Sequence, residues 1–321
     1  MPGTSMSSLP FPPLDLLRRT GRVEDDNPVA SYDDVGLRVR HLIDSMLPPD
    51  WNWSGKRVLD FGCGAGRVLR HFAPEAAEGE FWGCDIDGRS IDWLAKHLSP
   101  PFQVLQCDEA PGLPFPDGTF DLIYAMSVYT HIGDQWADWL LEHHRLLAEG
   151  GLLIATFLGE GMIEQLTGEQ WSDDTIGMNT LLAGNPWDLG GPITLQSPWW
   201  IEAHWGRAFD IVTMKLHDDD KPIGHGKVLL RRKPVRLTVE DLEMLEPSEP
   251  REVSALQHLV KQLRRETLEL RRIRDEREAL LDEQILGLRQ SLASMRTSSS
   301  WKITAPLRAA GGLLRRSKSA G

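Results

Sequence analysis

The stretch Val58-Leu-Asp-Phe-Gly-Cys-Gly-Ala-Gly-Arg67 is the part of the sequence that decides the fold class. It begins with apolar residues typical of a buried strand and continues into a turn that holds Gly62, Gly64 and Gly66. Glycines let the backbone approach a ligand closely, and a helix that begins after such a turn offers free N–H groups to an anion. The spacing is GxGxG, with Arg67 where a nicotinamide fingerprint would place its third glycine, so the pattern disfavours a dinucleotide.

The next expected strand ends at Gly83-Cys-Asp85-Ile-Asp87. A carboxylate at the tip of the neighbouring strand can accept hydrogen bonds from both hydroxyls of a ribose. We therefore expect a ligand that carries a ribose and has an anionic or zwitterionic end beside the glycines. Asp87 is better explained as the N-cap of the helix expected over residues 90–98 than as a ligand-binding residue.

Strand-like and helix-like segments alternate around these motifs. Short β-rich runs lie at 57–61, 80–86, 102–107, 120–127 and 151–158, and helix-like segments lie at 32–47, 66–72, 90–98 and 135–148. This alternation predicts a doubly wound α/β fold, with a mostly parallel sheet and helices on both faces. Two further runs, at 209–216 and 227–232, predict an antiparallel pair at one edge and bring the sheet to seven strands.

Four motifs follow one another within residues 35–233: VLDFGCGAGR, GCDID, LPFPDGTFDLIYAMSVYTHI and HHRLLAEGGLLIATF. In this order they resemble the class I S-adenosylmethionine-dependent methyltransferases. The resemblance implies a Rossmann-like sheet, a methyl-transferring enzyme and S-adenosylmethionine as its cofactor. It also implies cofactor contacts from residues on these motifs, namely Asp60, Gly62, Cys63, Gly64, Gly66, Asp85, Ile86, Asp108 and Ser127. Of these, Asp85 would hold the ribose hydroxyls, and Asp108, or Glu109 in its place, would lie by the adenine.

The residues after the fourth expected strand bear on the methyl acceptor. Related N-methyltransferases carry an Asn-Pro-Pro-aromatic motif there, whereas this chain has Met126-Ser-Val-Tyr-Thr-His131, which favours transfer to oxygen. His131 stands at the carboxyl end of a strand, where a neutral imidazole could take the acceptor's proton. The alternative is that Thr130 and His131 cap the helix expected over 135–148. His225 is a weaker candidate for the same base.

Seven of the twelve tryptophans lie between Trp136 and Trp205. Five of them border an irregular stretch, residues 159–196, or the helix after it, and we expect this stretch to close over the acceptor. Indole rings stack on sugar rings, so these tryptophans favour a glycan acceptor, although packing in the core explains them equally well. The five are Trp171, Trp187, Trp199, Trp200 and Trp205.

The composition, 41% hydrophobic and 26% charged, is typical of a soluble globular chain, and no apolar run has the length of a membrane span. The N-terminal residues up to Pro13 hold no Lys or Arg, so we expect no signal peptide and a cytoplasmic location. Cys63, Cys84 and Cys107 have neither CxxC spacing nor an even number, so we expect reduced thiols and no metal site.

Charge divides the chain at Pro250. Residues 251–321 carry 15 Lys and Arg against 8 Asp and Glu, so the net charge of −12 leaves −19 on residues 1–250. Because residues 1–250 are this acidic, they repel the phosphates of nucleic acids, which disfavours nucleic acid as a partner. The basic end begins with apolar residues at a spacing of three and four, which predicts a coiled coil and self-association. Its two blocks are Val253, Leu256, Val260, Leu263 and Leu270, and Leu281, Ile285, Leu288, Leu292 and Met295.

These patterns predict five parts of the chain. They are a flexible arm over 1–30, the methyltransferase domain over 31–235 with a lid or insert at 159–196, a linker over 236–250, a coiled-coil helix over 251–296 and a basic amphipathic tail over 297–321. The tail, with Trp301 and Ile303 between its charges, is similar to tails of bacterial surface-polysaccharide enzymes. It would contact an anionic inner membrane face or such an enzyme.

The function expected is O-methylation of a hydroxyl on a cell-surface glycan or lipid-linked saccharide. Two alternatives stay open at this point. One is a small-molecule O-methyltransferase, and the other is a scaffold that binds the cofactor without turnover and recruits polysaccharide enzymes.

Overall fold

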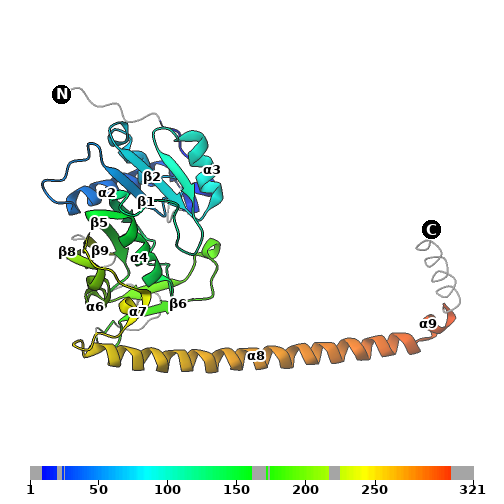
Figure 1. Cartoon of the computed structure of the whole chain (residues 1–321). Coiled ribbons are helices and arrows are strands. Elements are labelled where there is room, and N and C mark those ends of the chain that lie inside the picture. The colour runs from blue at the N-terminus through cyan, green and yellow to red at the C-terminus, as the bar shows by residue number, and fades with distance from the viewer. Residues whose placement is uncertain are drawn as a thin grey trace. The chain divides into compact units, whose positions relative to one another are not determined.

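The apolar runs around the glycine turn form one seven-stranded sheet (Figure 1). The computed structural model describes residues 9–19, 24, 26–160, 171–172, 174–216 and 225–304. The chain forms two compact units, residues 1–259 and 260–321. The sheet lies in the first unit and has the order β3-β2-β1-β4-β5-β9-β8. Its strands are β1 (Arg57–Phe61), β2 (Glu80–Asp85), β3 (Gln103–Gln106), β4 (Phe120–Ala125), β5 (Leu147–Phe157), β8 (Phe209–Lys215) and β9 (Gly226–Arg232).

The direction of the strands agrees with the prediction. Strands β1 to β5 pair in parallel, and β9 is antiparallel to both of its neighbours, β5 and the edge strand β8. Because strands β1, β2 and β4 are parallel neighbours, their carboxyl ends meet at one edge of the sheet. The glycine turn, Asp85 and the segment after β4 are therefore brought together there, although they are far apart in the sequence.

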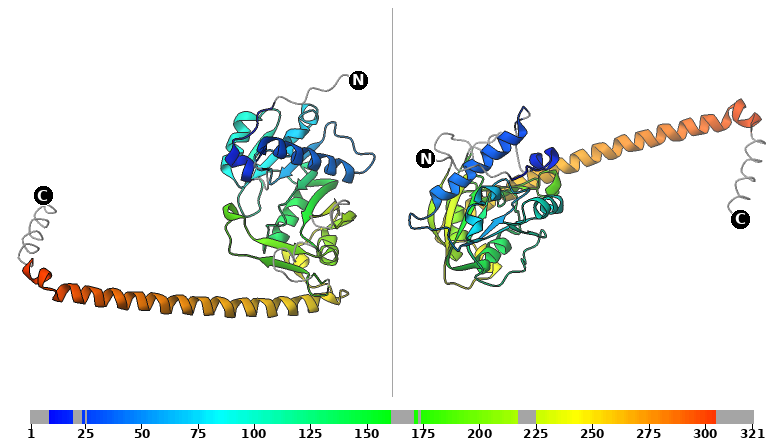
Figure 2. Two further views of the ribbon diagram at one scale, coloured as in Figure 1. Left: turned by 180° about the vertical axis from the view of Figure 1, so that it is seen from behind. Right: turned by 90° about the horizontal axis from the view of Figure 1, so that it is seen from above.

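Helices cover both faces of the sheet, as a doubly wound fold requires. One hydrophobic cluster joins a face of the sheet to α2 (Pro28–Met46), the 3-10 helix η1 (Leu69–Phe72) and α3 (Gly88–His97). A second cluster joins the other face to α4 (Trp136–Leu146) and α6 (Pro198–Ala208). In the view from above in Figure 2, α2 is the blue helix along one side of the unit.

The helix predicted over residues 66–72 is shorter than expected. The chain makes turns after Gly66, and only η1 (Leu69–Phe72) is helical, as a 3-10 helix. Pro74 lacks a backbone N–H and its ring conflicts with a continuing α-helix, so too few residues remain for stable α-helical turns. The glycine turn thus does not lead into an α-helix, and the anion site at a helix N-terminus that the pattern suggested is not formed there.

The expected flexible arm needs a correction over residues 9–19. Helix α1 (Leu14–Arg19) buries Leu16 and Leu17, and the Arg70 guanidinium donates to the carbonyls of Leu9 (2.8 Å) and Pro10 (3.2 Å). These residues pack on the domain because the leucine pair offers apolar surface and Arg70 lies under the backbone ahead of it. The rest of the predicted arm, residues 1–8, 20–23 and 25, lies outside the described part.

The insert at 159–196 is more regular than expected in its described part. Strands β6 (Met178–Leu181) and β7 (Ile193–Gln196) form an antiparallel hairpin, with the 3-10 helix η3 (Trp187–Leu189) between them. The Thr194 N–H donates to the carbonyl of Thr130 at 2.8 Å, which ties the hairpin to the segment after β4. Residues 161–170 and 173 of the insert lie outside the described part.

The expected linker, residues 236–250, also packs on the domain. It holds α7 (Val239–Glu243), whose Leu242 is fully buried, and Arg207 of α6 donates to the carbonyls of Asp241 (2.6 Å) and Leu242 (3.1 Å). His204 of α6 bonds to the Leu242 carbonyl (2.7 Å) and to Oε1 of Glu252 (2.8 Å). The segment is therefore part of the first unit, and its apolar Leu242 is the reason.

The long C-terminal helix is confirmed as a helix. It is α8 (Arg251–Thr297), followed by the short helix α9 (Ser299–Ile303), and the first unit extends into α8 as far as residue 259. Residues 305–321, which hold most of the predicted basic tail, lie outside the described part. Within the described residues, no helix is long and apolar enough to cross a membrane.

Candidate cofactor and acceptor site

The turn after β1 has a backbone that only glycines adopt easily. Gly62, Gly64 and Gly66 have φ angles of 80°, 52° and 79°, in the left-handed region. A Cβ on Gly62 would also lie 2.3 Å from a methyl carbon of Val128 in the segment after β4. The N–H of Gly62 donates to the Cys84 carbonyl at 2.8 Å, so the turn is tied to β2 as well. Contacts with β2 and with the segment after β4 therefore hold the turn after β1 in one conformation.

Asp60, near the end of β1, is a buried carboxylate beside this turn. It is 3% exposed, and burial raises its pKa to about 8, against the opposing effects of the Tyr124 hydroxyl and the Arg67 charge. Its Oδ2 atom has no hydrogen-bond partner among the described residues. A buried acceptor atom without a partner is costly in a folded protein, and a cationic ligand group would satisfy it.

Arg67, directly after the turn, also has a buried polar atom, and its charge is opposite to that of an ionised carboxyl group. Burial lowers its pKa, and its Nε atom is buried with no hydrogen-bond partner in the described part of the chain. Asp60 lies just before the turn and Arg67 just after it, and the charge of each shifts the pKa of the other. A carboxyl group and a guanidinium, each with one buried atom that has no partner among the described residues, fit an amino-acid zwitterion such as the methionine end of S-adenosylmethionine. The sequence analysis used Arg67 only as a missing glycine, although a cation directly after the turn was a visible signal.

Asp85 lies at the carboxyl end of β2, the strand beside the glycine turn, as the sequence predicts. Its Oδ2 accepts from the Gly64 N–H at 2.7 Å and its Oδ1 from the Asp87 N–H at 2.8 Å, while burial raises its pKa. These bonds fix the carboxylate, and each oxygen keeps a lone pair for a ribose hydroxyl. Ile86 follows it in the same turn. Asp87 is the N-cap of α3, as predicted, and accepts from the Arg89 N–H and the Ser90 hydroxyl.

The remaining predicted cofactor residues have mixed surroundings. Cys63 is buried, and burial raises the pKa of its thiol, so it is a packing residue and no nucleophile. Asp108 and Glu109 follow β3 and are both exposed, so the structure does not choose between them. All three cysteines are free, and the described residues hold no cluster that could bind a metal ion.

His131 lies in the loop after β4 and contacts the insert. Its Nδ1 bonds to the Pro192 carbonyl at 2.8 Å, so Nδ1 carries the proton and Nε2 has the lone pair. The capping role is not observed, because the N-cap of α4 is Gln135 and no side chain accepts there. The Thr130 hydroxyl is buried and has no partner among the described residues. His131 thus connects the loop after β4 to the hairpin.

Ser127 has an unusual backbone at the carboxyl end of β4. Its φ is 60°, a left-handed conformation that is strained for a residue with a side chain. Its N–H donates to Oγ1 of the buried Thr156 at 2.7 Å, and its Oγ lies 3.1 Å from Nδ1 of His225. Three strands, β4, β5 and β9, therefore contribute to this arrangement at the carboxyl edge.

The tryptophans expected to contact a glycan are mostly core residues. Trp199, Trp200 and Trp205 on α6 are buried in the cluster between α4 and the sheet. Trp171 packs beside a smaller cluster under the insert, and Trp187 on η3 is 40% exposed. The carbohydrate interpretation therefore loses most of its support from tryptophan, because burial against the sheet explains three of these rings.

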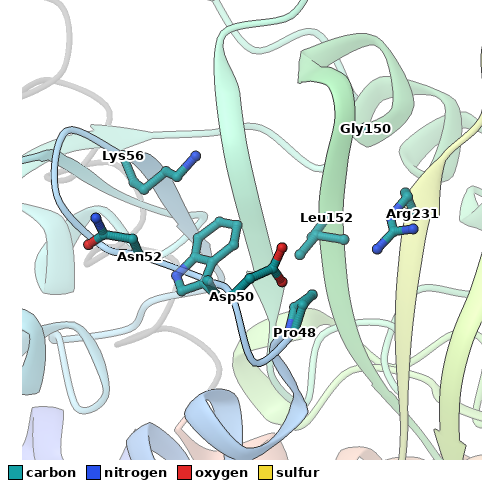
Figure 3. A pocket seen from close by; sticks show the side chains of 8 residues that line it. Pro48, Asp50, Asn52, Lys56, Gly150, Leu152 and Arg231 are labelled. Atoms are coloured by element: carbon teal, nitrogen blue, oxygen red, sulfur yellow. The ribbon is translucent and has the colours of Figure 1, made fainter.

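Figure 3 shows a pocket at the opposite edge of the sheet. Its volume is about 290 Å³, and its lining includes the charged residues Asp50, Lys56 and Arg231. Lys56 precedes β1, and Arg231 is at the end of the antiparallel β9, so the pocket lies at the amino ends of the parallel strands. It is separate from the glycine turn and contributes nothing to the site described above.

Comparison with known proteins finds methyltransferases. Residues 33–180 match the model of a family described as "Methyltransferase domain". The 2-methyl-6-phytyl-1,4-hydroquinone methyltransferase of Synechocystis is 32% identical over 114 residues, which cover 34% of this chain and 32% of that protein. The 27-O-demethylrifamycin SV methyltransferase of Amycolatopsis mediterranei is 28% identical over 132 residues, 40% of this chain and 47% of that protein. The matches thus span about a third to a half of these curated relatives.

Solved structures of similar description also match. A putative S-adenosylmethionine-dependent methyltransferase from Listeria monocytogenes has a TM-score of 0.45 and 17% identity, with 60% of this chain and 97% of that chain covered. The strand order, the glycine turn after β1 and Asp85 after β2 are those of the Rossmann-like methyltransferase fold. Residues 33–180 of this chain match the methyltransferase-domain family, and S-adenosylmethionine is the cofactor of that class.

Proposed function

We propose that this protein is an enzyme that transfers the methyl group of S-adenosylmethionine to a hydroxyl oxygen. The observation that carries the proposal is two buried side-chain atoms beside the glycine turn, Oδ2 of Asp60 and Nε of Arg67, which have no hydrogen-bond partner among the described residues. They match the ammonium and the carboxylate of the cofactor's methionine end in sign and number. Asp85, one strand away, would accept hydrogen bonds from its ribose.

The residues of this chain would act mainly by positioning. S-adenosylmethionine, when bound, supplies a methyl group on a positively charged sulfur that is already a good leaving group. Asp60, Arg67 and Asp85 would fix the cofactor at both ends, and the hairpin of the insert, tied to the loop after β4, would cover the acceptor. Holding the acceptor oxygen about 3 Å from the methyl carbon supplies much of the rate enhancement of such a transfer.

Oxygen is favoured over nitrogen because the segment after β4 lacks the Asn-Pro-Pro-aromatic motif. His131 stays a candidate base, since Nε2 carries its lone pair. The acceptor we propose is a hydroxyl of a glycan or lipid-linked saccharide at the inner face of the membrane, and its main support is the resemblance of the C-terminal part. A small-molecule acceptor is the second candidate, and the names of the relatives above favour it, because both are methyltransferases of small molecules.

The long helix supports a further part of the proposal, self-association. A scaffold that binds the cofactor without turnover would use the same helix, so the helix does not distinguish a scaffold from an enzyme. Transfer of a labelled methyl group does, because only an enzyme transfers it. With methyl-labelled S-adenosylmethionine, an enzyme transfers label to an acceptor fraction of the cell extract, and the lipid and water-soluble fractions distinguish the two acceptor classes.

Binding of S-adenosylhomocysteine, measured by calorimetry beside NAD, tests the cofactor assignment. We expect heat with S-adenosylhomocysteine alone, and a loss of affinity of roughly 10-fold or more for Asp85→Ala, because a buried ribose-binding carboxylate is removed. Asp92→Ala, on the exposed face of α3, is the matched control and should bind as wild type. A folded wild-type protein that binds no S-adenosylhomocysteine would contradict the proposed function.

A further inference from the structure

The Ser127–His225 contact is the feature of the carboxyl edge that cofactor binding leaves unexplained. Ser127 is exposed, and its Oγ lies 3.1 Å from Nδ1 of His225, within hydrogen-bond distance. His225 comes directly before β9, whose first residue Gly226 pairs with Phe157 at the end of β5. The two side chains thus lie where β4, β5 and β9 reach the same edge as the glycine turn.

The backbone of Ser127 is held in place from beneath. Its φ of 60° lies in the left-handed region, which is strained for a residue with a side chain, and the bond from its N–H to the buried Thr156 hydroxyl at 2.7 Å maintains it. Strained residues that their surroundings hold fixed are concentrated at functional sites. No packing role explains the strain, because the Ser127 side chain is exposed at this edge.

The neighbouring residue places Ser127 beside the methionine end of the cofactor site. A methyl group of Val128 occupies the space that a Cβ on Gly62 would need, so the segment after β4 touches the glycine turn. Asp60 itself pairs with Tyr124 of β4 in the sheet register. Ser127 therefore lies next to the residue that packs on the glycine turn, where the methionine end of the cofactor would bind.

We propose that Ser127 and His225 form the proton-accepting pair of the methyl transfer, which rests on the proposed function. With the lone pair of His225 on Nδ1, the Ser127 hydroxyl donates to it and its own lone pairs face the acceptor. The acceptor O–H bond breaks as the new O–CH3 bond forms and the S–CH3 bond breaks. The acceptor proton moves to Ser127 Oγ, and the proton of Ser127 moves to His225 Nδ1. The sulfur keeps the electron pair of its broken bond and is neutral in S-adenosylhomocysteine, while the positive charge ends on the imidazolium.

The proposal places His225, and not His131, near the methyl group of the cofactor, and this placement can be tested. An imidazole that receives the proton must stand near the methyl group, so a cation at position 225 repels a cation at the methyl position. Sinefungin carries an ammonium there, whereas S-adenosylhomocysteine has a neutral thioether, and the two ligands are otherwise alike. Protonation of Asp60 or Asp85 changes the affinity for both ligands equally, because they share the methionine end and the ribose. The ratio of the two affinities therefore depends only on the surroundings of the methyl position.

Calorimetry with both ligands on the full chain tests the proposal. We expect His225→Lys to weaken sinefungin about 10-fold or more relative to S-adenosylhomocysteine, since a cation within several ångströms costs at least this much. His97→Lys on the exposed part of α3 is the control.

Each outcome decides the question. If S-adenosylhomocysteine binds but the ratio is unchanged in His225→Lys, the proposal is wrong. If His131→Lys changes the ratio and His225→Lys does not, His131 holds the position instead. If the wild type binds neither ligand, the proposed function itself fails, and this result is distinct from the other two.

Discussion

Among single residues, Asp60 has the surroundings with the clearest functional consequence. Its pKa is raised from an ordinary value of 3.8 to about 8, chiefly by burial, so the free protein holds it protonated at neutral pH. An ammonium ligand needs the ionised form, so binding must release a proton. The raised pKa is therefore a property of the empty site that ligand binding would reverse.

We predict that the affinity for S-adenosylhomocysteine rises about tenfold per pH unit between pH 6 and 8 and then levels off. The folded protein binds more protons at Asp60 than the unfolded chain between pH 3.8 and about 8, so this group lowers stability as the pH rises through that window. Asp60→Asn should thus bind more weakly, lose the pH slope, and resist urea better than the wild type at pH 8.

Calorimetry and urea unfolding check these expectations together. A slope that persists in Asp60→Asn would assign the titration to Asp85, whose pKa burial also raises. An affinity that does not change with pH in the wild type would show that neither carboxyl ionises on binding.

At the scale of elements, α1 lies against the cofactor side of the domain. Arg19 at its end pairs with Asp87 (Nε to Oδ2, 2.9 Å), two residues after Asp85, and lies over the Trp187 ring at 5.2 Å. Asp15 at its start pairs with Arg89 of α3. One short helix thus joins the N-cap of α3 to the insert, next to the carboxylate expected to hold the ribose.

We expect Arg19→Ala to weaken S-adenosylhomocysteine binding by about 3- to 10-fold, mainly through faster dissociation, because a partly buried ion pair that closes the site is lost. Stopped-flow dissociation with a fluorescent cofactor analogue measures this. Arg38→Ala removes an exposed ion pair on α2 and is the matched control. Equal dissociation rates for Arg19→Ala and wild type would show that α1 does not cover the site.

Across the whole molecule, the apolar side chains of α8 are the main surface without a structural explanation. The exposed fraction of the side chains in the two blocks of the predicted seam lies between 42% for Leu256 and 70% for Leu288. A solvated single helix of this length gains little from such residues, whereas a coiled coil buries them. The two blocks differ in phase, with Arg274 and Arg277 between them, so the seam shifts register midway.

We predict that the full chain sediments as an oligomer and that Ile285→Asp with Leu292→Asp makes it a monomer, because each adds a charge to the seam. Leu268→Asp, at a residue that is also exposed (65%) but lies off the seam, should leave the oligomer intact. Sedimentation equilibrium at tens of micromolar distinguishes these results. A monomeric wild type at that concentration would contradict self-association through α8.

Local patterns in the sequence were sufficient for most of the fold. The strands at 57–61, 120–125 and 226–232 and the helix from 251 could be predicted because apolar spacing and glycine positions act over short distances. The packing of residues 9–19 and 239–243 could not, because Arg70 and Leu242 act through partners far away in the chain. The same holds for Trp199 and Trp205, whose burial depends on the sheet beneath α6.

The sequence by itself determined the local features of the carboxyl edge: a glycine turn after one strand, Asp85 at the end of the next, and a segment after β4 without the N-methylating motif. The tertiary structure alone decided how these parts combine. It buried atoms of Asp60 and Arg67 that have no hydrogen-bond partner in the described part of the chain, brought Ser127 to His225 across 98 residues, and placed His131 against the hairpin. Spacing along a chain fixes what a single strand or turn presents, whereas burial and contact between strand ends arise only when the sheet brings them to one edge.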